Sequence, residues 1–155
     1  MSDVSRRRAV LAEATEWLKT PYHHAGRVKG AGVDCLTLLA EVYERTGIIP
    51  HVEIPFYPPD WHLHRDAERY LEGVMRYARE YTCSPFGRDG DEVVKPVPEL
   101  GDIAIFKFGR CFAHGVIVTG WPQFIAANVD LGQVIAGSAT DPWLAKRAAR
   151  FFDPF

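Results

Sequence analysis

The chain has 155 residues, of which 47% are hydrophobic and 25% charged, and a formal net charge of −2. This length and composition predict one globular domain, residues 1–155, around a single hydrophobic core. A net charge so close to zero gives no reason to expect a nucleic-acid partner or an anionic membrane surface. No apolar run approaches the roughly 20 residues that span a bilayer, and the polar N-terminus does not resemble a signal peptide. We therefore expect a soluble protein that is cytoplasmic on synthesis.

The three cysteines, Cys35, Cys83 and Cys111, are an odd number, and none belongs to a CxxC pair. A disulfide framework and a structural zinc site are therefore not expected. The adjacent His23 and His24 would point to different sides of an extended chain, so they cannot easily bind one ion. The sequence predicts no metal and no cofactor.

The first third of the chain has the apolar spacing of helices. The pattern predicts a first helix over residues 4–19, which Thr20-Pro21 ends. A loop rich in glycine and basic residues follows over 22–33. A second helix then runs from Cys35 to Thr46, with apolar residues on one side and Gly47 as its C-terminal cap.

The middle of the chain alternates between loop and helix signals. Four prolines lie in or beside residues 51–61, which predicts an extended surface segment. Residues 66–81 have the spacing of a third helix. The polar, glycine-containing residues 84–91 are expected to form a loop.

The last third changes to the period of strands. Short apolar segments separated by turn residues predict an antiparallel meander over 102–108, 114–119, 123–129 and 133–136. Asp141-Pro142 is a good start for a short helix ending near Ala149, and residues 150–152 predict a last strand. Helices first and strands later indicate an α+β fold.

Cys35 is the candidate nucleophile. It follows a glycine-rich loop and lies in the first turn of the second predicted helix, with Asp34 as the expected helix cap. The free amides and the dipole at a helix N-terminus favour a thiolate over a thiol. Neither Cys83 nor Cys111 has this placement, so both are interpreted as small buried residues.

His114 is the candidate general base. It begins a strand-like segment and precedes Gly115, which would allow close approach of the cysteine helix or of a substrate. Cysteine on a helix followed by histidine on a strand is the order found in papain-like cysteine hydrolases. The pair predicts amide hydrolysis through a covalent thioester.

The chain resembles the NlpC-type (NlpC and p-sixty) cell-wall cysteine peptidases, and most closely their phage-tail and gene-transfer-agent branch. Together the matching segments cover nearly the whole chain, and segment 57–61 is similar to an insertion of the phage branch. The segments that carry the resemblance are Trp17–His24, Gly32–Leu38, Glu99–Phe106 and Ala113–Val118.

The resemblance implies a papain-like fold in which the helix carrying the nucleophile packs on an antiparallel sheet. It implies cleavage of γ-D-glutamyl–diaminoacid bonds in peptidoglycan stem peptides. It also implies that Tyr22 supports the oxyanion or the substrate near Cys35. Asp34 and His23 are further expected substrate-side residues.

The chain departs from the family pattern at the third catalytic position. Relatives carry a histidine where this sequence has Ala126. Asn128 lies two residues further on and therefore on the same strand face, from which it could orient the imidazole of His114. Thr37 is a second departure, because a small residue is usual there.

Two other functions stay open at this point. Ala126 motivates an inactive tail-hub or muropeptide-binding domain that keeps the fold. Another papain-like amidase or acyltransferase would use the same cysteine on a different amide. The expected partners are peptidoglycan stem peptides and, for a chain carried in a phage or prophage tail, the proteins of the tail tip.

Overall fold

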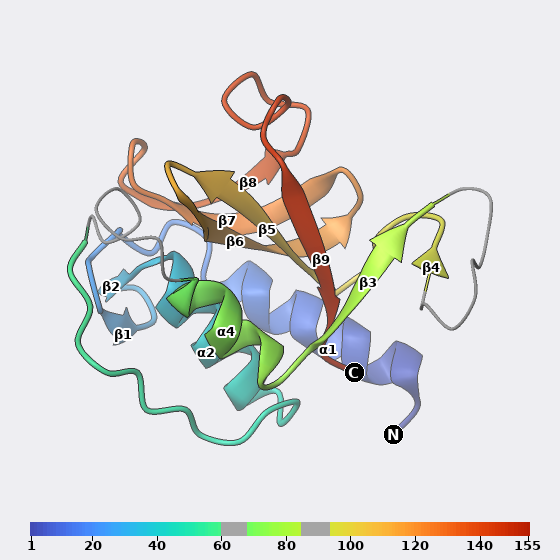
Figure 1. Ribbon diagram of the computed structural model, residues 1–155. Coiled ribbons are helices and arrows are strands. Elements are labelled where there is room, and N and C mark those ends of the chain that lie inside the picture. Colours follow the sequence, from blue (N-terminus) through green and yellow to red (C-terminus); the bar gives the residue numbers. More distant parts are fainter. Residues whose placement is uncertain (60–67, 85–93) are drawn as a thin grey trace.

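A computed structural model describes residues 1–59, 68–84 and 94–155. The three helices of the described residues lie on one side of a twisted sheet, and a small hairpin precedes α2 (Figure 1). The helices are α1 (Asp3–Glu16), α2 (Cys35–Arg45) and α4 (Arg69–Met75). The hairpin strands are β1 (Arg27–Val28) and β2 (Gly32–Val33). The strands of the main sheet are β3 (Arg79–Cys83), β4 (Val94–Lys95), β5 (Ile103–Phe108), β6 (Cys111–Gly120), β7 (Gln123–Asn128), β8 (Gln133–Ser138) and β9 (Ala149–Asp153).

The main sheet has seven strands in the order β4-β3-β9-β5-β6-β7-β8. Strands β5 to β8 form the predicted antiparallel meander, and β9 pairs with the free edge of β5. Only the short β3–β4 pair is parallel among the described strands. The predicted α+β class is confirmed, and the last strand was also anticipated.

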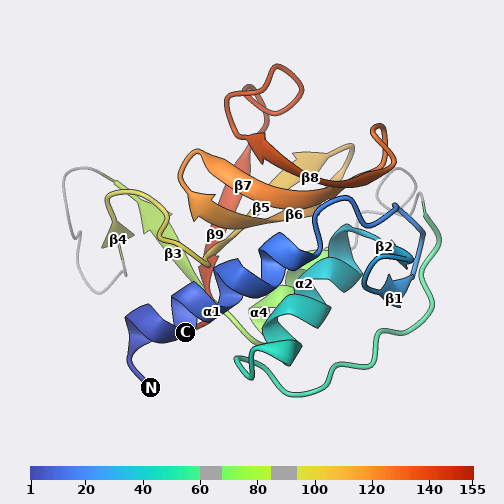
Figure 2. The same ribbon diagram turned by 180° about the vertical axis from the view of Figure 1, so that it is seen from behind.

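The two faces of the sheet bury different sets of residues. The helix face meets α1, α2 and α4 and includes Ile105, Ile117 and Ile125. The opposite side, here called the outer face, is covered by the segment between β8 and β9 (Figures 1 and 2). Because strand side chains alternate, each residue of β5 to β7 belongs to one face only.

An ion-pair cluster ties α1 to the sheet. Arg7 donates to Asp102 Oδ1 at 2.8 Å and to the Leu100 carbonyl at 2.9 Å. Lys95 Nζ lies 2.8–3.0 Å from carboxylate oxygens of Glu99, Asp102 and Asp153. These three carboxylates are close enough together to bind a metal ion, but Lys95 and Arg7 already neutralise them.

One predicted helix is shorter than expected, and another is absent. Residues 79–83 form β3 rather than the end of a helix over 66–81, because Tyr81 pairs with Phe151 and its hydroxyl donates to buried Asp102. The start of that predicted helix and most of the predicted 84–91 loop lie outside the described residues. Residues 141–149 form turns, since Asp141 caps the β8 end by accepting from the Ser138 amide.

None of the helices in the described part of the chain has the length and apolarity needed to cross a bilayer.

Candidate active site around Cys35

Cys35 is the first residue of α2, as predicted, and Asp34 is its N-cap. Asp34 Oδ1 accepts from the amides of Leu36 and Thr37 at 2.9 and 2.8 Å. The Thr37 hydroxyl accepts in return from the Asp34 amide at 2.9 Å, which completes a capping box. The departure at Thr37 therefore fixes the turn that presents the thiol.

The thiol of Cys35 lies against β6. Its Sγ donates to the carbonyl of Ala113, with 3.6 Å between sulfur and oxygen. Burial, and then the charge of Asp34, raise the pKa of Cys35 to about 12. Hydrogen bonds involving the Gly115 backbone, the Cys35 backbone and the Tyr70 side chain act in the other direction and only partly offset this. At neutral pH the group is a thiol in this arrangement.

Tyrosines from three different segments surround the cysteine. Tyr70, from α4, donates its hydroxyl to the Cys35 carbonyl at 2.8 Å. A side chain at Gly115 would overlap that hydroxyl and Leu39, so the glycine makes room for both. Burial raises the pKa of Tyr22 and of Tyr57 above the usual range, and the negative charge that Cys35 and Asp34 can carry adds to the effect.

A proline-rich segment, residues 48–59, runs beside the start of α2 and is fastened to the site by Tyr57. The Tyr57 hydroxyl donates to Asp34 Oδ2, and His24 Nε2 donates to the Tyr57 carbonyl at 2.7 Å. His23 is exposed, and its Nδ1 lies 3.0 Å from the His24 carbonyl. His24, not the predicted His23, is the histidine of this loop that approaches the site.

His114 lies on the outer face of the sheet, away from Cys35. Its ring packs between Phe108 and Trp143, with centroid distances of 5.4 and 5.3 Å. Burial, and then the nearby Arg147, lower the pKa of His114 to about 4. Nε2 is buried without a hydrogen-bond partner in the described structure, which costs about 1–3 kcal/mol. The predicted nucleophile and base are not brought together in this arrangement.

A one-residue bulge in β6 accounts for this placement. His114 pairs with Phe106 and Phe112 pairs with Lys107, so Ala113 is an extra residue between the two pairs. Phe112 and Ala113 both pack on the helix face, and the backbone carbonyl of Ala113 accepts from the Cys35 thiol. The strand period alone would not reveal such a bulge.

Asn128, the predicted third catalytic residue, makes a different contact. Asn128 Oδ1 accepts from the Leu131 amide at 2.9 Å and so caps the turn between β7 and β8. Ala126 is buried on the outer face, the same face as His114. The two positions that the resemblance pairs thus share a face, but it is not the face of Cys35.

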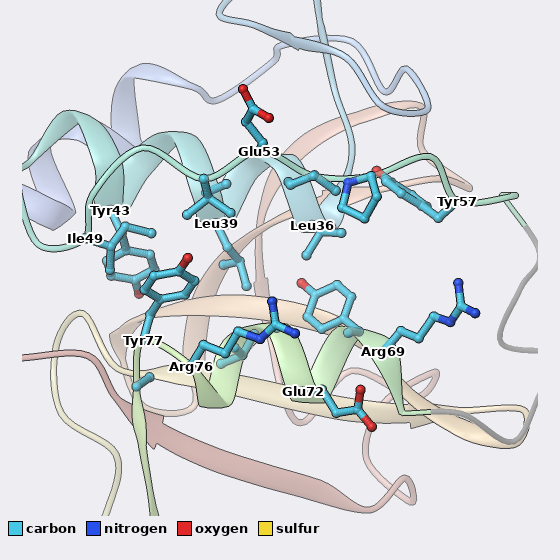
Figure 3. A pocket seen from close by; sticks show the side chains of 18 of the residues that line it. Leu36, Leu39, Tyr43, Ile49, Glu53, Tyr57, Arg69, Glu72, Arg76 and Tyr77 are labelled. Atoms are coloured by element: carbon cyan, nitrogen blue, oxygen red, sulfur yellow. The ribbon is translucent and has the colours of Figure 1, made fainter.

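An apolar pocket of about 340 Å³ opens beside the start of α2. Leu36 and Leu39 of α2, the proline-rich segment and α4 line it (Figure 3). Arg69 and Glu72 of α4, and Arg76 directly after it, also line the pocket (Figure 3). Within the described parts of the chain, neither guanidinium has an ion-pair partner.

The sequence pattern predicts Cys35, Asp34 and Tyr22 at one site and takes His23 rather than His24 as the cleft residue. It gives no indication of Tyr57 or Tyr70. Tyr70 has the spacing of an ordinary core residue of a helix, and Tyr57 lies in a segment with no periodic signal. Only the tertiary contacts show that both hydroxyls reach the first turn of α2.

Solved structures similar to this chain are NlpC/p60 domains. The NlpC/p60 domain of the peptidoglycan hydrolase SagA is 20% identical with a TM-score of 0.60, over 93% of this chain and 96% of that one. The peptidoglycan hydrolase RipB from Mycobacterium tuberculosis is 15% identical with a TM-score of 0.62, over 100% of this chain and 69% of that one. NlpC2 from Trichomonas vaginalis is 17% identical with a TM-score of 0.61, over 96% of this chain and 46% of that one.

No protein-family model and no curated protein matches the sequence. The similarity is therefore one of fold, and it extends over nearly all of this chain. The chain has the papain-like α+β fold of NlpC/p60 domains.

Proposed function

We propose that this chain is a cell-wall cysteine peptidase that cleaves peptidoglycan stem peptides, with Cys35 as the nucleophile. The observation that carries the proposal is the position of Cys35, a free cysteine in the first turn of a capped helix. This is where an attacking sulfur and backbone donors for an oxyanion occur together. The solved proteins named peptidoglycan hydrolases support the choice of substrate, because they share this fold.

In the proposed reaction, the Cys35 thiolate attacks the amide carbonyl carbon and forms a tetrahedral oxyanion. The Cys35 amide and the hydroxyl of Tyr22 or Tyr70 stabilise that oxyanion. Collapse releases the amine, which takes up the proton that left the thiol, and leaves a thioester on Cys35. Water then hydrolyses the thioester and restores the thiol. His114 is the proposed proton carrier.

The proposed bond is the γ-D-glutamyl–diaminoacid amide that the sequence resemblance implies. Stem peptides carry free carboxylates, and Arg69 and Arg76, which have no ion-pair partner among the described residues, line the pocket beside Leu36. Methionine at both positions should weaken stem-peptide binding by roughly 100-fold or more, since each charge-assisted hydrogen bond contributes about 1.5–3 kcal/mol. Arg8, which is exposed on α1, is the matched control position.

Digestion of purified stem peptides, followed by mass spectrometry of the products, tests the proposed function. The native chain should release a fragment that begins with the diamino acid, and Cys35→Ala should release none while keeping its circular dichroism spectrum. Equal product from Cys35→Ala, or none from the native chain, would reject the peptidase.

A second candidate function is favoured by one specific observation. Ala113, and not His114, is next to Cys35, which suits a domain that binds stem peptides without cleaving them. Such a domain would bind a stem peptide with no turnover. Ala113→His should then create activity, because position 113 lies on the helix face, where Cys35 also packs. Ala126→His should not, because position 126 faces the outer side of the sheet.

We also propose, from the resemblance of the sequence to the phage branch, that the chain acts as part of a phage or prophage tail. Quantitative mass spectrometry of purified particles tests this association. The chain should be present in intact tails at a fixed ratio to the tail-tip proteins. Its absence from purified tails would contradict the proposal.

A further inference from the structure

We infer that β6 has two registers that exchange Ala113 and His114 between the faces of the sheet, so that the base is withheld from Cys35 in one register and delivered in the other. The inference rests on the proposed peptidase function and names how that site is regulated. The described arrangement is the withheld register, with His114 between Phe108 and Trp143.

The exchange needs a change in only one strand pair. At present Phe106 pairs with His114, and Ala113 is the bulged residue. If His114 becomes the bulged residue, Phe106 pairs with Ala113 while Ile105–Gly115 and Lys107–Phe112 stay as they are. Directly paired residues share a face, so Ala113 then joins Phe106 on the outer face. His114 then lies on the helix face, where Ala113 now packs and its carbonyl accepts from the Cys35 thiol.

Gly115 makes the second register accessible. A bulge moved toward Gly115 bends the strand at a residue with no side chain to reorient, and glycine suits bulged positions. The neighbouring pairs toward the end of β6, Ala104–Val116 and Ile103–Ile117, keep their faces and their core contacts. The movement is therefore confined to Ala113, His114 and the backbone between them.

In its present position, the imidazole of His114 lacks a hydrogen bond at Nε2 to any described residue. Its Nε2 is buried with no partner among the described residues, and the guanidinium of Arg147 stacks over the adjacent Phe108 ring at 3.8 Å. Protonation of the imidazole is disfavoured there. On the helix face the same nitrogen would meet the Cys35 sulfur, a group that gives a proton to a neutral imidazole. Binding of a stem peptide that uses this pair would favour the second register.

Disulfide trapping of the full chain tests the exchange, because two cysteines can be joined only when their α-carbons come within about 7 Å. Three single variants each introduce one cysteine on β6, and the rate at which it forms a disulfide with native Cys35 is compared. Ala113→Cys reports the described register, His114→Cys reports the second register, and Val116→Cys is the matched control on the outer face. Peptide mapping by mass spectrometry separates these disulfides from any that involve Cys83 or Cys111.

We expect Ala113→Cys to be joined to Cys35 rapidly, and His114→Cys to be joined more slowly but at least tenfold faster than Val116→Cys. A stem peptide should increase the rate for His114→Cys. Trapping of His114→Cys no faster than Val116→Cys would overturn the inference. Trapping of His114→Cys without Ala113→Cys would also overturn it, since only one register would then exist.

Wild-type protein provides a readout that needs no change at position 114. The imidazole carbon resonance of His114 should shift on addition of a stem peptide in the native chain but not in Cys35→Ala. The two proposals fail in different ways. Cys35-dependent cleavage without trapping at position 114 rejects the register exchange alone, whereas trapping at both positions without cleavage rejects the peptidase alone.

Discussion

Cys35 lies where a nucleophile is expected, at the start of a helix, but its thiol is protonated in the described arrangement. A cysteine at a helix start is expected to be acidic, but burial and the Asp34 carboxylate together outweigh the helix amides and raise the pKa to about 12. The sequence predicted the placement correctly because a glycine-rich loop and an Asp cap are local signals. The ionisation depends on what covers the thiol, which is a tertiary property.

Alkylation by iodoacetamide, measured peptide by peptide, checks this ionisation. Because the thiolate is the reacting form, Cys35 in the folded chain at pH 8 should react roughly 100-fold or more slowly than in the urea-unfolded chain. Its rate should rise steeply only above about pH 10. Rapid alkylation of Cys35 near pH 6 would mean that the thiol is already activated in the resting protein.

His114 gives the protein a specific sensitivity to acid. Its pKa falls to about 4 in the folded chain from the ordinary value of 6.5, so the unfolded state binds the proton more readily. The stability that neutral His114 allows is complete above about pH 6.5 and is lost progressively as the pH falls toward 4.

Urea unfolding at pH 7 and pH 5 measures this loss. Wild type should lose about 2 kcal/mol more unfolding free energy between the two pH values than His114→Gln, which keeps a neutral side chain throughout. Equal losses in both proteins would show that the imidazole is not buried on the outer face.

At the scale of elements, the start of α2 depends on Asp34. Its carboxylate accepts from Leu36, Thr37 and Ala25 amides and from the Tyr57 hydroxyl, so it joins helix, loop and proline-rich segment. Asp34→Ala should therefore reduce the unfolding free energy by about 2 kcal/mol, the upper range for loss of a helix cap. Asp34→Asn keeps the acceptor oxygen, and urea unfolding should show a smaller loss. Losses of equal size would mean that the charge, and not the cap, is what matters.

The strands of the meander could be predicted from the sequence because each is a short apolar run between turn residues. Their facing could not be predicted beyond the first irregularity. The extra residue Ala113 decides whether residue 113 or residue 114 lies on the helix face. The alternation of apolar residues along the strand is compatible with either arrangement. The helix expected over 66–81 failed for a related reason, since pairing with β9 outweighs the local helical spacing of residues 79–81.

In the molecule as a whole, the ion-pair cluster around Asp102 joins α1 to strands β3 and β4 of the sheet. Arg7 on α1, Lys95 on β4 and Tyr81 on β3 all contact this buried carboxylate. Removing one partner of a buried ion pair leaves the other charge uncompensated. Arg7→Met should cost about 3 kcal/mol in thermal or urea unfolding, and the exposed neighbour Arg8→Met should change it by less than about 0.5 kcal/mol. Similar effects at both positions would contradict a structural role for the cluster.

In the proposed reaction, Cys35 forms a covalent intermediate with a peptidoglycan stem peptide. Intact-mass and peptide-mass spectrometry of an acid-quenched mixture of the chain and a defined stem tetrapeptide would test it most directly. We expect a thioester on the Cys35 peptide with the mass of the fragment ending in D-glutamate, and none in Cys35→Ala. Release of the diamino-acid fragment with no adduct, or by Cys35→Ala as well, would contradict it.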